Sequence, residues 1–164
     1  MDNNKHIVEF RFVFSRQQML AFRTGELVKR WAAQYQDLFD GDDLRIHASQ
    51  PKYHFYEYLA AVLFRETMGY NTLIEKYETA SHKAKIARFR TIAGEAVYQD
   101  VMANHAGVPD LFVFSSDSTL TKPNWFFCEV KGKGDWLRPH QDERFKQLYQ
   151  VSKKPVYVLY LAEK

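Results

Sequence analysis

The spacing of apolar residues changes several times along the chain, and each change predicts a new element. From His6 to Phe14 apolar and polar residues alternate loosely, which predicts a strand with one buried face. Ser15 is suited to cap a helix, and apolar residues then recur at helical spacing, so one amphipathic helix is expected to about Tyr35. Residues 39–51 (FDGDDLRIHASQP) bring turn formers and a proline, which predict a loop with room for one short strand.

Helical spacing returns in the middle of the chain. A second helix is expected from about Pro51 to Gly69, because glycine readily takes the left-handed backbone that ends helices. A third helical region is expected from Thr72 to about Ala106, with a break near Gly94.

The last third of the chain returns to the short period of strands. Residues 110–114 and 125–131 predict the two strands of an antiparallel hairpin, joined by the turn formers of residues 115–124. Pro139 suits the first position of a helix, where no amide hydrogen is needed. Residues 155–161 predict a closing strand.

Length and composition favour a single folded unit. A chain of 164 residues that is 46% hydrophobic can bury one sizeable core. Without an internal repeat or a low-complexity tract, we expect one α/β domain, in which an N-terminal elaboration, residues 1–50, packs on a core of residues 51–164. No run of 18 apolar residues occurs and the first five residues are polar, so a soluble, intracellular, cytoplasmic protein with no membrane contact is expected. The lone Cys128 excludes an internal disulfide and is expected to be a small buried hydrophobe.

Charge adds little until its distribution is considered. The net charge of +3 is compatible with many kinds of partner. Residues 82–92 (HKAKIARFRTI) hold four basic residues and no acid, and are expected to form a solvated helix surface. The acids of residues 40–43 lack the later glutamate of a calcium loop, so a solvated turn is expected there. A second basic group surrounds one later turn and suits phosphate contacts; its members are Lys131, Lys133, Arg138 and Arg144.

Charged residues interrupt apolar faces of the predicted hairpin. Alternation places Glu129 and Lys131 on the same face as Trp125 and Phe127. Asp110 likewise shares the face of Phe112 and Phe114 on the other strand. Burial of a lone carboxylate costs free energy, which a bound divalent cation or an ion pair with the lysine would offset.

This set of side chains suits phosphodiester hydrolysis. A hard cation such as Mg²⁺, held by two carboxylates, can polarise a phosphate and lower the pKa of a bound water. A neighbouring lysine can orient or deprotonate the attacking water, or place positive charge beside the transition state. The residues leave these roles of Lys131 open.

The same residues resemble the signature of the PD-(D/E)xK nucleases. Pro109 and Asp110 are followed, with 18 residues between the two acids, by Glu129, Val130 and Lys131. The strings GVPDLFVF, FFCEVKGKGDWLRPHQ and PVYVLYL are similar to the VRR-NUC branch, the virus-type replication and repair nuclease domain. Three further positions match the pattern of that branch, namely Gly107, Gly132 and Gln141.

The resemblance implies a fold and an activity. It implies an α/β, restriction-endonuclease-like core, with a small mixed sheet flanked by helices and an N-terminal strand-helix elaboration. It further implies a DNA endonuclease that depends on Mg²⁺ or Mn²⁺, selective for branched or flapped DNA, acting in the repair, recombination or phage replication of a bacterium or phage. Small members pair to cut two strands, so a homodimer is also implied.

The resemblance also implies roles for individual residues. The metal ligands would be the carboxylates of Asp110 and Glu129, the main-chain carbonyl of Val130, and a glutamate on the first core helix. Glu57 suits that last place better than Glu66, which lies at a helix end where it reaches solvent more easily. The implied catalytic set is Asp110, Glu129, Lys131, Gln141 and Glu57.

Contacts to DNA are expected from the turn after the second hairpin strand. Lys133 and Arg138 lie on this glycine-flanked turn, His140 follows them, and all three are candidate phosphate contacts. Trp136 suits base stacking and packing equally well. The other histidines show no tight metal-binding spacing, and most are expected at the surface.

Two other readings stay open. One is a DNA-binding module that keeps the nuclease fold but is catalytically inactive. The other is a metabolic α/β enzyme that carries the motif by accident. Residues 1–50 match nothing in the family pattern, and their role as a packing cap, a dimer element or a DNA-binding arm also stays open.

Overall fold

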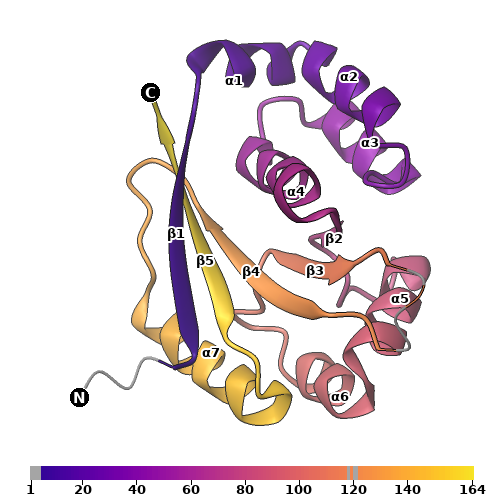
Figure 1. Ribbon diagram of the computed structural model, residues 1–164, viewed down its shortest axis with the longest axis vertical. Helices are drawn as coiled ribbons and strands as arrows, with labels where there is room; N and C mark the ends of the chain where they lie inside the picture. The colour runs from indigo at the N-terminus through magenta and orange to yellow at the C-terminus, as the bar shows by residue number, and fades with distance from the viewer. Residues whose placement is uncertain (1–4, 118, 120–121) are drawn as a thin grey trace.

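The computed structural model describes residues 5–117, 119 and 122–164, and its centre is one mixed five-stranded sheet (Figure 1). The strands lie in the order β1-β5-β4-β3-β2, with β1, β5 and β4 parallel to one another and β4, β3 and β2 antiparallel. Their bounds are β1 Ile7–Phe14, β2 Tyr70–Ile74, β3 Leu111–Ser115, β4 Trp125–Lys131 and β5 Val156–Glu163. The hairpin of β3 and β4 is therefore confirmed, and so are the first and last strands.

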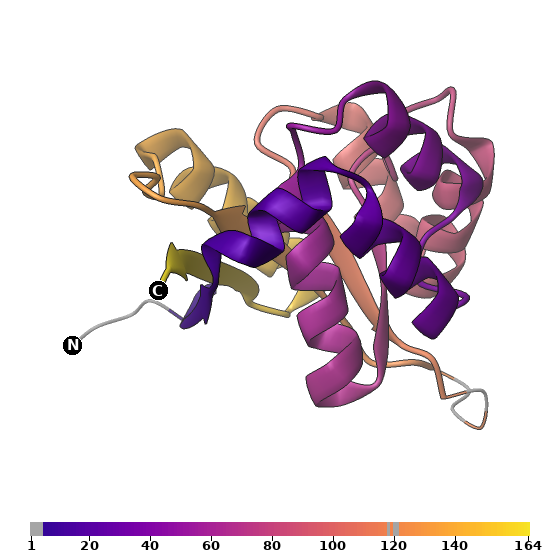
Figure 2. The same ribbon diagram turned by 90° about the horizontal axis from the view of Figure 1, so that it is seen from above.

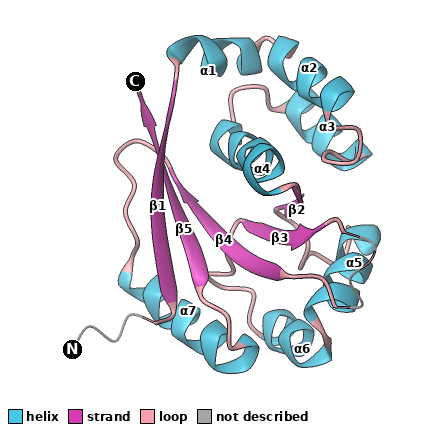
Figure 3. Cartoon of the chain, in the orientation of Figure 1, coloured by secondary structure: helices cyan, strands magenta, loops and turns pink. Residues whose placement is uncertain are grey.

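Helices cover both faces of this sheet (Figures 1 and 3). On one face α4 packs on the sheet and the first three helices lie over it, whereas the last three helices lie on the other face. Figure 2 shows the first four helices, drawn in indigo to magenta, next to one another. The bounds are α1 Arg16–Arg23, α2 Glu26–Gln34, α3 Gly41–Ser49, α4 Phe55–Met68, α5 Lys83–Ala93, α6 Glu95–Ala103 and α7 Pro139–Ser152. In the described part of the chain, no helix is both long and apolar enough to cross a membrane.

Strand β4 divides the core into two. Phe126, Cys128 and Val130 pack into the cluster under α4, while Trp125 and Phe127 pack into the cluster under α5, α6 and α7. All seven residues of β4 are buried, because helices cover both of its faces. The predicted alternation of β4 is thus confirmed, and it makes Glu129 and Lys131 buried charges.

Strand β1 departs from its prediction. Its predicted inner face is only partly covered: Phe14 is buried, but Val8 is 38% and Phe12 is 37% exposed. The reason is that β1 is the outermost strand and pairs only with β5. Phe10 still packs against Phe64 of α4, which gives this strand its link to the core.

The structures predicted for three segments were wrong. The single helix expected to Tyr35 is two helices, because Gly25 takes a positive φ of 84° between α1 and α2. The loop expected at residues 39–51 contains α3, whose first turn is stabilised by a capping box between Asp40 and Asp43. The start of the third helical region is instead β2, which pairs with β3 along its whole length. The break at Gly94 is confirmed, since α5 ends and α6 begins there.

Two expectations about surface charge were also wrong. Lys85 is not solvated: it is buried, and its Nζ donates to Asp43 Oδ1 at 2.7 Å and to the carbonyl of Ile74 at 2.8 Å. Arg144 is buried too, and its Nη1 lies 2.8 Å from Asp100 Oδ2. Both side chains join helices within the fold, so neither is free to contact phosphate.

Gly132, directly after β4, is required by a close approach of another side chain. A Cβ atom added there would lie 2.3 Å from the ring of Tyr56 in α4. That ring is held by Phe14, at 5.7 Å between ring centroids, so it cannot move away freely. The glycine therefore lets α4 approach the end of the strand that carries Glu129 and Lys131.

Gly132→Ala is expected to lower the free energy of unfolding by about 1 to 3 kcal/mol, the usual cost of overpacking. Urea denaturation measures this change. Gly41→Ala is the matched control, because a Cβ at Gly41 meets no atom within 4 Å. The double variant Gly132→Ala/Tyr56→Ala should lose less free energy of unfolding than the sum of the losses of the two single variants. Equal stability of Gly132→Ala and the wild type would contradict this reading of Tyr56.

Candidate active site

The predicted acids meet where β3 begins and β4 ends. Asp110 lies one residue before β3, and its Oδ2 accepts a hydrogen bond of 2.9 Å from the amide of Val130 in β4. The antiparallel register pairs Leu111 with Cys128, which brings Asp110 beside Glu129. The structure thus brings together the two halves of the motif that the sequence separates by 18 residues.

Glu129, Lys131 and Gln141 form a closed set of hydrogen bonds. Lys131 Nζ donates to Glu129 Oε1 at 2.7 Å and to Gln141 Oε1 at 3.0 Å. Gln141 Nε2 also donates to Glu129 Oε1 at 2.7 Å. Gln141 lies in the first turn of α7, and its Oε1 accepts from the amide of Arg138, the residue that precedes that helix. The start of α7 therefore helps to hold the lysine in place.

Glu57 of α4 approaches the same acids from the other face of the sheet. Its pKa is raised to about 7, mainly by burial and further by the charges of Glu75 and Glu129, against the lowering effect of His54. The pKa of Asp110 is raised well above its usual range, first by burial and then by Glu129 and Glu57. These mutual effects place Glu57 within electrostatic reach of both motif acids.

Glu66, the rival to Glu57, lies elsewhere. It is exposed near the far end of α4, and its carboxylate accepts a hydrogen bond from the hydroxyl of Tyr35. Its contact is therefore with the N-terminal helices rather than with the motif residues.

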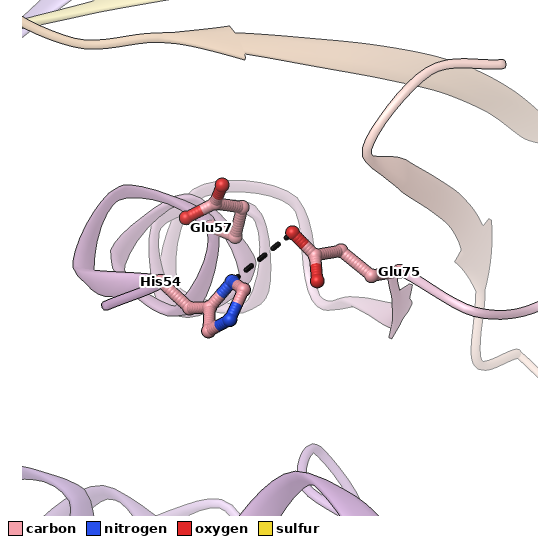
Figure 4. Close-up of side chains that lie close together, drawn as sticks. All are labelled: His54, Glu57 and Glu75. Atoms are coloured by element: carbon pink, nitrogen blue, oxygen red, sulfur yellow. Dashed lines mark hydrogen bonds and ion pairs between the residues drawn. The ribbon is translucent and has the colours of Figure 1, made fainter. Parts of the chain in front are cut away.

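Two residues that the sequence analysis did not single out lie beside Glu57 (Figure 4). His54 precedes α4 and Glu75 follows β2, and His54 Nδ1 lies 3.2 Å from Glu75 Oε1. One ligand atom from each of His54, Glu57 and Glu75 lies within 4.8 Å of the other two. Glu75 was missed because its segment was predicted as helix; the short apolar run TLI before it is compatible with a strand end but does not by itself distinguish one.

The three residues of Figure 4 are the one group of this kind found among the described residues. The ligand atoms of Asp110, Glu129 and Glu57 do not all lie within 4.8 Å of one another. Two of these carboxylates have hydrogen-bond partners of their own: Glu129 Oε1 accepts from Lys131 and Gln141, and Asp110 Oδ2 accepts from the Val130 amide.

The charges of the site fit a divalent cation. Four carboxylates influence one another here, those of Glu57, Glu75, Asp110 and Glu129. Lys131 pairs with only one of them, Glu129, and it is itself buried. Oxygen donors around excess negative charge are the environment that Mg²⁺ and Mn²⁺ prefer. Asp110, Glu129, Glu57 and the Val130 carbonyl are the groups that would hold such an ion.

The predicted DNA contacts lie on the surface beside this site. Lys133, Arg138 and His140 are exposed, and Trp136 is 68% exposed, which argues against a packing role for it. Lys133 lines a groove of about 540 Å³ that begins at Gly132, directly after Lys131. Arg11 and Tyr160 line the same groove, with the guanidinium of Arg11 5.0 Å from the ring centre of Tyr160. The lining also holds Lys164 and two acids, Asp135 and Glu163. Cations and an aromatic ring in one groove are groups that can contact a nucleic-acid strand.

The raised pKa of Glu57 predicts a pH dependence of stability. Glu57 has an ordinary pKa of 4.5 and a pKa of about 7 in the fold. Between these values the folded chain binds the extra proton, so stability falls as pH rises through this window, by at most about 1.4 kcal/mol per pH unit for one proton. Glu57→Gln should flatten the slope between pH 5 and pH 8, measured by urea denaturation in a chelator. An unchanged slope would contradict the assigned pKa.

Comparison with known proteins finds one matching family model and several similar solved structures. The model of the VRR-NUC domain matches residues 44–161. No curated protein gives a significant match. Among solved structures, paFAN1 bound to DNA with a two-nucleotide 5′ flap and a gap is 22% identical at a TM-score of 0.32, and the alignment covers 67% of this chain and 24% of that one. The complex of paFAN1 with a one-nucleotide 5′ flap is 17% identical at a TM-score of 0.36, with 99% and 38% of the two chains covered. The chain thus spans well under half the length of these proteins.

Proposed function

The chain belongs to the VRR-NUC family, and on that premise we propose that it is a metal-dependent nuclease that hydrolyses phosphodiester bonds in DNA. Its mixed sheet flanked by helices is the PD-(D/E)xK nuclease fold. The observation that carries the proposal is the meeting of Asp110, Glu129 and Lys131 at the end of β4, with Gln141 bonded to two of them.

The acids supply the binding site of the cation. Asp110, Glu129, Glu57 and the carbonyl of Val130 would hold Mg²⁺ or Mn²⁺, and the ion would offset the burial and the mutual repulsion that raise the pKa values of Asp110 and Glu57. When bound, the ion polarises the phosphate and lowers the pKa of a bound water.

Lys131 supplies a fixed positive charge. Its bonds to Glu129 and Gln141 hold Nζ within a buried site, where its charge is less screened than in water. This charge stabilises the negative charge that develops on the phosphate in the transition state. Gln141 is a positioning residue in this scheme, because it acts through Lys131 and Glu129.

The exposed segment after β4 supplies contacts to the DNA strand. Lys133 and Arg138 are exposed cations next to the acids, and His140 follows them at the start of α7. They would bind backbone phosphates and so place one phosphodiester at the acids. Selectivity for flapped or branched DNA, and pairing of two copies of the chain, are further parts of the proposal.

The proposal is tested by incubating the chain with plasmid, hairpin, 5′-flap and four-way-junction DNA, in Mg²⁺, in Mn²⁺ and in a chelator. Cleavage only with metal, and faster cleavage of flap or junction DNA than of linear duplex, is the expected result. Binding of these DNAs without cleavage under every condition would instead identify an inactive DNA-binding module. Preferential binding of a small phosphate metabolite would identify a metabolic enzyme.

A further inference from the structure

His54, Glu57 and Glu75 form a cluster with the composition of a metal site (Figure 4). The ligands of one ion lie a few ångströms from one another, because each is about 2.0 to 2.2 Å from the metal. One ligand atom from each of these three residues already lies within 4.8 Å of the other two. Small side-chain rotations would therefore bring one imidazole nitrogen and two carboxylate oxygens around a single cation.

The orientation of His54 is what a ligand needs. Its Nε2 lies 3.3 Å from Gln50 Oε1, an oxygen that can only accept, so this nitrogen can donate its proton there when Nδ1 binds an ion. That contact leaves Nδ1 facing Glu75, on the side of the two carboxylates. Ligating histidines are commonly oriented in this way, with the second ring nitrogen donating to an oxygen outside the site.

Four carboxylates, those of Glu57, Glu75, Asp110 and Glu129, lie against the three positive charges that Lys131 and one divalent ion would supply. The negative charges of Glu75 and Glu129 both act on the carboxylate of Glu57 and raise its pKa, after burial. No lysine or arginine among the described residues forms an ion pair with Glu57 or Glu75. A single divalent ion held by Asp110, Glu129 and Glu57 would leave Glu75 with His54 as its only ion-pair partner among the described residues.

We propose that His54, Glu57 and Glu75 bind a second divalent cation, a first-row transition ion such as Mn²⁺ or Zn²⁺, with Glu57 shared between the two ions. This inference rests on the proposed function, which supplies the first ion. The nitrogen donor separates the two sites chemically: imidazole suits Zn²⁺ and can also bind Mn²⁺ beside carboxylates, whereas Mg²⁺ takes oxygen ligands. The second site therefore discriminates against Mg²⁺. Binding displaces the hydrogen bond between His54 and Glu75, and any proton on Nδ1 is released to solvent.

Direct binding of Mn²⁺ tests the site without any measurement of cleavage. Titration calorimetry with MnCl₂ should find two ions in the wild type and one in His54→Ala and in Glu75→Gln. Asp110→Asn should retain the ion at His54. Gln50→Ala, which frees the imidazole but removes no ligand, should weaken the second site by about tenfold or more. The matched controls are His105→Ala and Glu163→Gln, which change exposed residues outside both sites.

A spectroscopic readout identifies the nitrogen ligand in the wild type itself. Pulsed electron paramagnetic resonance of the Mn²⁺-loaded chain should show coupling to an imidazole ¹⁴N, and His105→Ala should keep it while His54→Ala loses it. Wild type with one bound Mn²⁺, or with no imidazole coupling, would overturn the proposal, even if the His54 variant fails to fold.

The two proposals fail in different ways. Two Mn²⁺ ions with imidazole coupling, in a chain that cuts no DNA, would refute the nuclease and leave the second site standing. Cleavage of DNA by a chain that binds Mn²⁺ equally well with His54→Ala would refute the second site alone.

Discussion

Asp110→Asn is expected to lower the rate of DNA cleavage by on the order of a thousandfold, while the affinity for DNA changes little. Asparagine keeps the shape of the side chain and an oxygen that can still accept from the Val130 amide. What it removes is the negative charge, and with it a ligand of the proposed cation. Lys131→Ala should have an effect of similar size, because it removes the charge held beside Glu129.

Single-turnover cleavage of a 5′-flap substrate in Mn²⁺ measures the loss, and filter binding in Ca²⁺ measures affinity. The matched controls are Asp37→Asn and Lys29→Ala, two exposed residues far from the site in sequence, which should cut at the wild-type rate. Cleavage by Asp110→Asn at the wild-type rate would mean that this acid is not part of the catalytic centre.

Lys85→Met is expected to destabilise the fold by about 3 to 5 kcal/mol near pH 8, the usual cost of leaving a buried charge without its partner. Lys85 joins three parts of the chain, since it lies in α5 and bonds to Asp43 of α3 and to the Ile74 carbonyl at the end of β2. Its loss would leave the Asp43 carboxylate and the Ile74 carbonyl buried and short of a donor. Chemical denaturation measures the change.

The destabilisation by Lys85→Met should shrink in acid. Burial raises the pKa of Asp43 from 3.8 to about 6, even though Lys85 lowers it. Because the folded pKa is the higher one, Asp43 costs stability as pH rises from about 4 to 6, and without Lys85 this cost grows and extends to higher pH. Near pH 5 the protonated acid carries no charge, so the variant should lose less there.

Two variants complete this test. Lys85→Met/Asp43→Asn should recover much of the lost stability, because neither charge remains while the oxygen of the introduced carboxamide can still accept from the backbone amide of Asp40. Lys83→Met changes an exposed lysine of the same helix and should be near neutral. A loss that is the same at pH 5 and pH 8, and that the double variant does not reduce, would show that packing rather than charge explains Lys85.

Much of the candidate site follows from local patterns. The alternation of residues 125–131 places Glu129 and Lys131 on one face of β4, and that face is observed. The turn formers between the two strands predict an antiparallel pair, which brings Asp110 to Val130. Glu57 was preferred to Glu66 for a place that the family resemblance implies, and its role stays a prediction. The two inferences about the strands succeed because side-chain direction in a strand depends only on neighbouring residues.

Other parts of the site depend on residues that are distant in sequence. The five residues 70–74 are too few for their apolar pattern to distinguish a strand from a helix end. They form β2 because the edge of β3 is available for pairing. Glu75 acquires its place from that pairing, since its amide bonds to the Asp110 carbonyl at 2.8 Å. The pattern of its own helix predicts that Lys85 lies at the surface. It is buried because its Nζ bonds to Asp43 of α3 and to the Ile74 carbonyl at the end of β2.

The sequence by itself determined the motif, the strands that carry it and the face on which each charge lies, because these depend on local spacing. Only the tertiary structure decided that Glu75 and His54 join Glu57, that Lys85 is buried, and that Tyr56 packs against Gly132. Those facts depend on which distant segments meet, and the free energy of such contacts comes from burial and charge pairing that no short stretch of residues contains.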